Sequence, residues 1–147
     1  RIEFWDVTDN VIYNSNTVLF NVDTIYPAVD IVITSGMGDC GDFVPGDTIS
    51  GTYSIIDTYS HSMSISMTPA AEAAGSVISI DGIVTSSLSY AGGTLPGAGQ
   101  AGTWQIQTPA TIKPCGYNVW IGGNDRAIVH SSGFYHHSSL AKGFCIG

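Results

Sequence analysis

The amino-acid sequence predicts an all-β protein, an antiparallel β-sandwich of about eight to ten strands that forms a single domain over residues 1–147. Three observations predict this fold. β-Branched residues gather in short runs, apolar and polar residues alternate within many of these runs, and clusters of Gly, Pro, Asn and Asp separate them. A period of two residues buries one face of a strand and exposes the other, which is the pattern that a two-sheet sandwich requires.

The expected strands follow one another along the whole chain. They cover residues 16–24, 28–35, 47–57, 61–68, 76–84, 102–108, 115–123, 126–131 and 142–147. The run HSMSISMT at residues 61–68 illustrates the pattern, because its methionines and isoleucine share one face and its serines share the other. No segment has the period of an amphipathic helix, and PAAEAAG at residues 69–75 is expected to form at most a single turn.

Composition restricts the classes of function. The chain has a formal net charge of -8 and only 11% charged residues, so it would repel a nucleic acid backbone and an anionic membrane surface. The sequence contains no run of about 18 apolar residues, the length that predicts a membrane-spanning helix. Few lysines, many Ser, Thr and Gly residues and a start at Arg1 lead us to expect a processed extracellular or cell-surface protein, or a domain excised from one.

Two stretches resemble immunoglobulin-like domains in large, mostly uncharacterised secreted or surface proteins of bacteria. They are GDTISGTYSIID at residues 46–57, and PCGYNVWIGGNDRAIV at residues 114–129 followed by GFCI at residues 143–146. The resemblance covers about a quarter of the chain. It implies an immunoglobulin-like sandwich with a structural or accessory role and no catalytic residues. Trp104 does not have the early-strand position of the antibody tryptophan that packs on a disulfide, so the disulfide of that family is not implied.

The three cysteines are an odd number, which in an oxidising compartment leaves one thiol free or paired with another chain. We expect a disulfide between Cys115 and Cys145, because they lie on strand-like segments that a hairpin can bring together. Cys40 is then the free thiol. The pairs Cys40–Cys145 and Cys40–Cys115 stay open as alternatives, since a sequence does not determine connectivity.

Two groups of side chains are candidates for a metal site. The acidic group lies on a glycine-rich bend: Asp39, Asp42 and Asp47. The second group consists of histidines: His130, His136 and His137. Calcium prefers several oxygen ligands and zinc accepts imidazoles, but aspartates also hold backbone amides in ordinary turns, and adjacent histidines of an extended strand point to opposite faces. No cofactor is therefore expected, with calcium as the alternative.

The signatures of common enzymes are missing. The sequence has no Gly-x-Ser-x-Gly, His-Glu-x-x-His, P-loop or dinucleotide-binding motif, and no Cys-x-x-Cys. Its only glutamates are Glu3 and Glu72, so a glycosidase-like carboxylate pair would need the turn aspartates. We therefore expect a protein that is not an enzyme.

Two functions remain. Residues 2–23 are strand-prone and contain neither Gly nor Pro, which suits an edge or donor strand that pairs with a neighbouring molecule; the alternative is an ordinary first hairpin. We expect a filament or surface-layer subunit that associates with itself or with other surface proteins. The second function is a carbohydrate-binding or adhesion module, whose sugar-stacking rings would come from the following residues: Trp5, Trp120, Phe134 and Tyr135.

Overall fold

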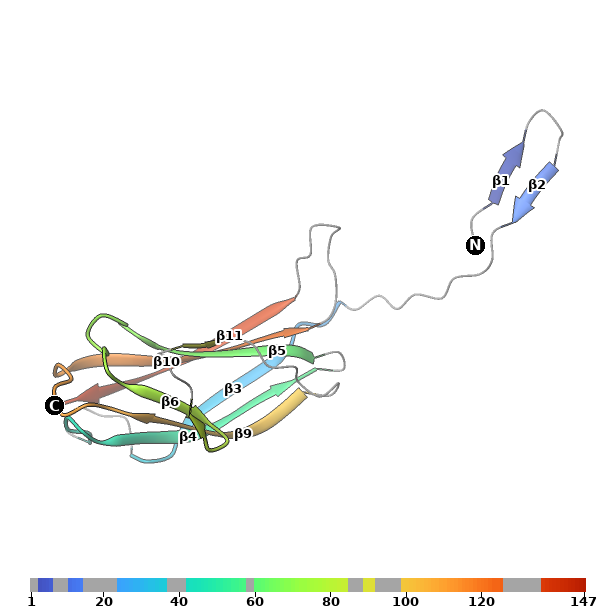
Figure 1. The fold of residues 1–147 in the computed structure, drawn as a ribbon. Helices are drawn as coiled ribbons and strands as arrows, with labels where there is room; N and C mark the ends of the chain where they lie inside the picture. The colour runs from blue at the N-terminus through green and yellow to red at the C-terminus, as the bar shows by residue number, and fades with distance from the viewer. Residues whose placement is uncertain are drawn as a thin grey trace.

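The computed structural model describes residues 3–6, 11–14, 24–36, 42–57, 60–84, 89–91, 99–125 and 136–147. In these ranges all of the regular secondary structure consists of β-strands (Figure 1). The strands are β1 (Glu3–Asp6), β2 (Val11–Asn14), β3 (Ala28–Ile33), β4 (Thr48–Ile56), β5 (Ser60–Thr68), β6 (Val77–Ile80), β7 (Ile83–Val84), β8 (Ser89–Ala91), β9 (Gly99–Gln107), β10 (Cys115–Asp125) and β11 (His137–Ile146).

Nine of the described strands form two antiparallel sheets that face each other (Figure 1). One sheet has the order β3-β4-β9-β6-β7 and the other has the order β11-β10-β5-β8. The constant-type immunoglobulin sandwich has one sheet with the strand order ABED and another with the order CFG. When the short strands β7 and β8 are left out, β3-β4-β9-β6 has the order ABED and β5-β10-β11 has the order CFG. The predicted antiparallel, immunoglobulin-like β-sandwich is thus confirmed.

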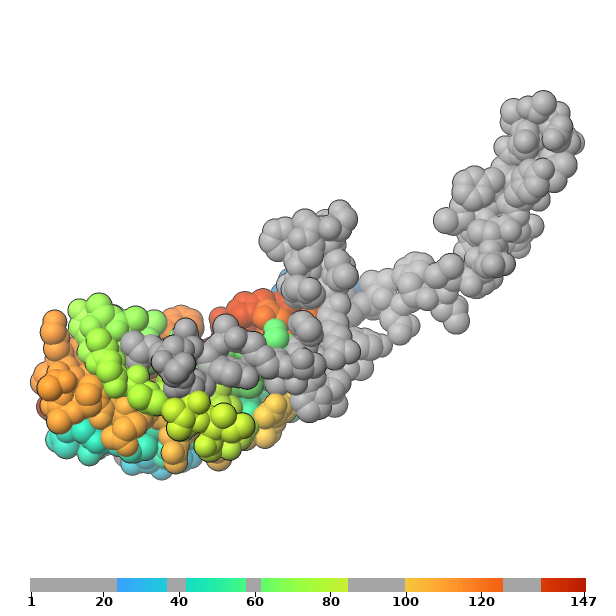
Figure 2. Space-filling view, viewed as in Figure 1, coloured from blue at the N-terminus to red at the C-terminus, as the bar shows by residue number. Residues whose placement is uncertain are grey.

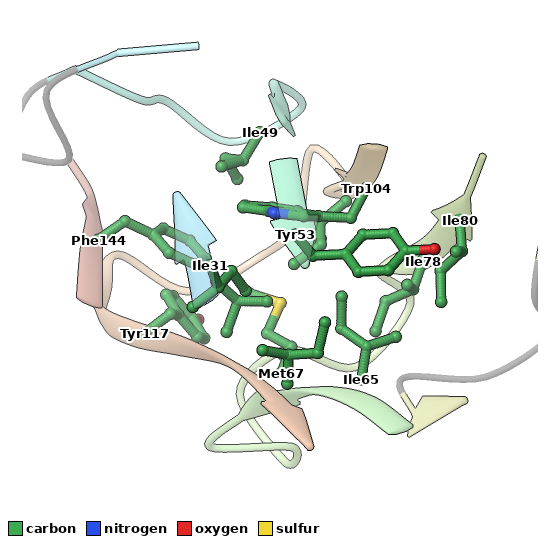
Figure 3. Packing of buried hydrophobic residues seen from close by; sticks show 14 of the residues in the cluster. Ile31, Ile49, Tyr53, Ile65, Met67, Ile78, Ile80, Trp104, Tyr117 and Phe144 are labelled. Atoms are coloured by element: carbon green, nitrogen blue, oxygen red, sulfur yellow. The ribbon is translucent and has the colours of Figure 1, made fainter. Parts of the chain in front are cut away.

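The core lies between the two sheets and consists of every second residue of the long strands (Figure 3). Its largest fully buried side chains are Trp104, Tyr117, Ile31, Ile49, Ile55, Ile65, Met67, Ile78, Ile106, Ile121, Ile146 and Val119. In β5 the methionines and the isoleucine face the core, whereas the serines are only half-buried on the other face. The alternation in the sequence therefore fixes which face of β5 packs inward.

Trp104 is accommodated by a glycine on the neighbouring strand. Gly51 is the cross-strand partner of Trp104, and a Cβ atom at Gly51 would lie 2.6 Å from the indole Cζ2 atom and 1.8 Å from the Val32 carbonyl oxygen. The indole Nε1 donates a 3.1 Å hydrogen bond to the carbonyl of Thr52, so the buried ring leaves no unpaired donor. The glycine in the middle of β4 therefore provides the room for the largest side chain of the core.

Several element boundaries differ from the sequence prediction. The expected strand 76–84 is two strands, because Asp81 and Gly82 have φ values of 50° and 80° and form the two-residue turn of a tight hairpin. The last strand begins at His137, not at residue 142, and β8 was not predicted. Residues 69–75 form the expected single turn, closed by a 3.2 Å hydrogen bond from Ala73 N to Pro69 O. Nearly all of the expected strand 16–24 and the whole of 126–131 lie outside the described residues.

The N-terminal strands β1 and β2 pair with each other. Their antiparallel register places Phe4 opposite Tyr13 and Trp5 opposite Ile12, and this two-stranded sheet is separate from both sheets of the sandwich. The sequence left two interpretations of residues 2–23 open, a donor strand and an ordinary hairpin. The part that the structure describes, β1 and β2, is a hairpin within the chain. The prediction that this segment adds to the sheet of a neighbouring molecule stays a prediction.

The chain enters the sandwich at one end, through β3, and leaves it at the other end, through β11. Ala28, the first residue of β3, pairs with Ile56 at the end of β4, whereas Gly147 N donates a 2.9 Å hydrogen bond to Phe43 O, close to the start of β4. Figure 1 shows the C-terminus at the end opposite to the start of β3. In the described ranges no helix long and apolar enough to cross a membrane is found.

Candidate functional site

The outer surface of the sheet formed by β5, β10 and β11 is a polar face without charged groups. By strand register its residues are Ser62, Ser64, Ser66, Thr68, Gly116, Asn118, Trp120, Gly122, Asn124, His137, Ser139, Ala141, Gly143 and Cys145. None of them is Asp, Glu, Lys or Arg, although the chain contains 16 such residues, 4 basic and 12 acidic. We call this surface the polar face.

Trp120 occupies the middle of the polar face. Its cross-strand neighbours are Ser66 on β5 and Ala141 on β11, and its side chain is 41% exposed. The indole Nε1 donates a 3.0 Å hydrogen bond to Thr68 Oγ1 on the same face. Tyr117, three residues earlier, points into the core instead and is 1% exposed. The alternation along β10 therefore separates a core aromatic from a surface aromatic.

A small hydrogen-bond network lies at one end of the polar face. Asn124 Nδ2 donates to Ser62 Oγ at 3.1 Å, and Asn124 Oδ1 accepts from His137 Nδ1 at 2.8 Å. The imidazole lies over Gly122, where a Cβ atom would be 2.8 Å from His137 Cε1. These contacts connect the three strands through side chains and fix the positions of the polar groups at this end.

A buried acid–imidazole pair closes the base of the β10–β11 hairpin. His136 Nδ1 lies 2.7 Å from Asp125 Oδ2, and the His136 amide donates a 3.1 Å hydrogen bond to Asp125 Oδ1. The two residues are 8% and 0% exposed, and the ring of Tyr26 packs on the imidazole with a centroid distance of 4.5 Å. Both carboxylate oxygens thus hold the hairpin closed. The sequence did not reveal this pair, because the two residues are 11 positions apart and meet only through the pairing of β10 with β11.

The two adjacent histidines point to opposite faces, as expected for an extended segment. His136 binds Asp125 in the interior, whereas His137 binds Asn124 on the polar face. Their Nδ1 atoms therefore serve different neighbours and do not converge on one point. His130 lies outside the described residues. Among those residues that the structure does describe, no group of three or more His, Cys, Asp or Glu side chains is placed to hold a metal ion.

Asp47, from the acidic group, takes part in turn chemistry. Its Oδ2 atom accepts a 2.8 Å hydrogen bond from Val44 N, and its own amide donates to Val44 O at 3.1 Å. Pro45 and Gly46, the latter with a φ of 97°, fit the central positions of a type II turn. Asp42 is exposed, and Asp39 lies outside the described residues. The sequence offered two roles for Asp47, a metal ligand and a turn residue that binds backbone amides. The second role accounts for these contacts.

The predicted disulfide between Cys115 and Cys145 is wrong, because Cys115 is a free thiol. The register explains why: Cys115 pairs with Ile146 and Cys145 pairs with Gly116, so the two cysteines are one position out of step. Successive side chains of a strand point to opposite faces. Cys115 consequently packs against the core, whereas Cys145 belongs to the polar face and is not a free thiol.

Tyr117 joins three segments at the start of β10. Its hydroxyl group donates to Lys113 O at 2.7 Å and contacts Glu72 O at 3.2 Å. A tyrosine near the start of strand F that bonds to a carbonyl just upstream is the tyrosine corner of immunoglobulin-like sandwiches. Burial raises the pKa of Tyr117 well above its ordinary value, and the hydrogen bond and charge of Cys115, followed by the charge of Glu72, raise this pKa further. The phenol is therefore a structural group.

Of the four proposed sugar-stacking residues, Trp120 is the one whose side chain is described and exposed. Trp5 is placed on β1 by its backbone alone, and Phe134 and Tyr135 lie outside the described residues. No protein-family model matches the sequence, and a search of curated proteins finds no significant match.

Proposed function

We propose that this chain is a non-catalytic extracellular structural protein that self-associates through exposed strand edges, as a subunit of a filament or surface layer. One observation carries the proposal. Strand β7 lies at the edge of the five-stranded sheet, and its two β-branched residues, Ile83 and Val84, are 74% and 68% exposed. Figure 2 shows this yellow-green segment at the surface. An exposed apolar edge strand is a template for pairing with another chain, and the template that β7 offers is two residues long.

The opposite sheet offers a less suitable edge. Lys142 on edge strand β11 pairs with Val119, a core residue, so its register is that of an inward-facing position, yet Lys142 is exposed. An inward-pointing lysine on an edge strand discourages pairing with another sheet. This difference between the edges favours association through β7 over association through β11.

The order of the strands and the tyrosine corner support the further proposal that the chain is related to the immunoglobulin-like domains of bacterial surface proteins.

Cys40 lies outside the described residues, and we propose the alternative pairing left open by the sequence, a disulfide between Cys40 and Cys145, which would agree with an extracellular location. Cys115 is free and Cys145 is not, which leaves Cys40 as the third cysteine of the sequence. Phe43 forms a parallel bridge with Ile146, so the chain three residues after Cys40 lies beside the residue that follows Cys145. A cystine persists in oxidising compartments and is rare in the cytosol.

The test is sedimentation velocity over a range of protein concentrations, with the natural sequence and Ile83→Lys. We expect the natural chain to form larger species as its concentration rises, and Ile83→Lys to stay monomeric. Val44→Lys is the matched control, because Val44 is 52% exposed in a turn and carries the same change away from β7. A natural chain that is monomeric at every concentration contradicts self-association, and equal assembly of both lysine variants and the natural chain contradicts the β7 edge.

A carbohydrate-binding or adhesion module is the second candidate. It is favoured by the exposure of Trp120 on a face that has many hydroxyl and amide groups and no charged groups. Aromatic rings with one free face are suited to stacking against the apolar face of a sugar. Retention of the protein on a panel of insoluble polysaccharides tests this function, and the absence of retention on every polysaccharide counts against it.

A further inference from the structure

We propose that the polar face binds a neutral glycan, with the Trp120 indole as its stacking platform. This inference rests on the second candidate function and names its site and its class of ligand. The site lies on the outer surface of β5, β10 and β11, on the sheet opposite to the one that contains β7. It is therefore independent of the association through β7.

The absence of charge on the polar face decides the class of ligand. The chain carries 12 acidic and 4 basic residues, yet none of them lies on the outer positions of these three long strands. A charged ligand without an opposite charge to bind would lose hydration without compensation. Hydroxyl groups of a neutral sugar exchange hydrogen bonds with water for similar bonds with serine, threonine and asparagine side chains. The face therefore matches an uncharged, hydroxyl-rich ligand.

Trp120 is restrained before any ligand arrives. The 3.0 Å bond from Nε1 to Thr68 Oγ1 ties the indole to the neighbouring strand on the same face. Because the N–H bond lies in the plane of the ring, this contact limits rotation of the ring about its side-chain bonds. A side chain that is already ordered loses less conformational entropy when a ligand binds. The remaining 41% exposure leaves part of the ring accessible for contact with a sugar.

The surroundings of Trp120 leave space for an extended ligand. Its cross-strand neighbours, Ser66 and Ala141, are small. The next outer position along β10 toward the hairpin is Gly122, and the His137 imidazole lies over it. Trp120 is therefore flanked by small residues on the neighbouring strands and by a polar ring on the hairpin side. On the other side along β10, Asn118 presents an exposed amide. A chain of sugar units can therefore contact the indole and polar groups on both sides of it.

The experiment is affinity electrophoresis of the folded protein in gels that contain one soluble polysaccharide each. The neutral probes are xyloglucan, galactomannan and dextran, and polygalacturonate is the anionic comparison. We expect retardation by at least one neutral polysaccharide and none by polygalacturonate. Trp120→Ala is expected to weaken the binding about two- to tenfold, the range that corresponds to the loss of a stacking contact. Trp120→Phe is expected to retain part of the affinity.

A second pair of variants tests the requirement for a neutral surface. Ser66→Asp places a carboxylate beside Trp120, whereas Thr52→Asp makes a similar change on the outer face of the opposite sheet. We expect the first to weaken binding and the second to leave it unchanged, with circular dichroism to verify that both fold. Unchanged binding in Trp120→Ala overturns the site but not the carbohydrate function. No retardation by any neutral polysaccharide overturns both, and neither result alters the test of self-association.

Discussion

The hydroxyl group of Tyr117 donates a 2.7 Å hydrogen bond to the carbonyl oxygen of Lys113, four residues earlier in the chain. We expect Tyr117→Phe to lower the free energy of unfolding by about 1–3 kcal/mol, because it removes the hydroxyl group that contacts two part-buried backbone carbonyl groups, at about 0.5–1.5 kcal/mol for each contact. Urea denaturation measures this loss. Tyr26→Phe is the control, since Tyr26 is 60% exposed. Equal stabilities of the two variants would contradict a structural role for the Tyr117 phenol.

The raised pKa of Tyr117 predicts how stability depends on alkaline pH. The folded-state pKa lies above the ordinary value of 10.0, so above about pH 10 the unfolded chain loses this proton while the folded chain keeps it. The contribution of Tyr117 is therefore complete below pH 10 and declines as the pH rises beyond it. We expect the free energy of unfolding, measured between about pH 8 and about pH 11, to decline less steeply with pH for Tyr117→Phe than for the natural chain. Identical declines refute the prediction.

The contact between Gly51 and Trp104 predicts that β4 does not accept a larger residue at this position. A Cβ atom there would overlap the Val32 carbonyl oxygen and the indole. We expect Gly51→Ala to cost at least about 1–3 kcal/mol, the usual range for overpacking, and thermal unfolding measures it. Gly116→Ala is the matched control, because nothing lies within 4 Å of the added carbon. A Gly51→Ala protein as stable as this control would show that Trp104 repacks easily.

The buried pair at the base of the β10–β11 hairpin is expected to contribute to stability. Asp125→Ala removes the acceptor of both the His136 amide and its imidazole, so we expect a loss of about 1–3 kcal/mol. His137→Ala changes an exposed neighbour and is expected to cost no more than about 0.5 kcal/mol. Hydrogen exchange gives a local measurement, in which the His136 amide should exchange faster in Asp125→Ala. Unchanged exchange would show that the carboxylate does not hold this amide.

The state of the cysteines can be measured by alkylation followed by mass spectrometry. In denaturant without reductant we expect one alkyl group, on Cys115, and after reduction we expect all three cysteines to react. Reduction should also lower stability by about 4–5 kcal/mol, the chain-entropy value for a loop of roughly 100 residues. Cys115→Ser should leave no reactive thiol before reduction. Labelling of Cys40 or Cys145 without reductant would contradict the proposed pair.

The features of the fold that depend on residues close together in the sequence could be predicted. The strands at residues 28–33 and 48–56 follow from alternating β-branched residues, and their boundaries lie within two residues of the prediction. The opposite orientations of Tyr117 and Trp120 also follow from the period of two residues. The division of residues 76–84 was missed because the tight turn at Asp81 and Gly82 interrupts a continuous run of strand formers.

The sequence by itself determined that the chain forms a β-sandwich and that each long strand has a buried face, because alternation and turn chemistry act between residues close in the chain. The tertiary structure alone decided which residues of distant strands meet. A shift of one residue in the register exchanges the two faces of a strand, and this shift packs Cys115 against the core while Cys145 lies on the outer face. The same pairing across distant strands brings His136 to Asp125 and surrounds Trp120 with uncharged side chains.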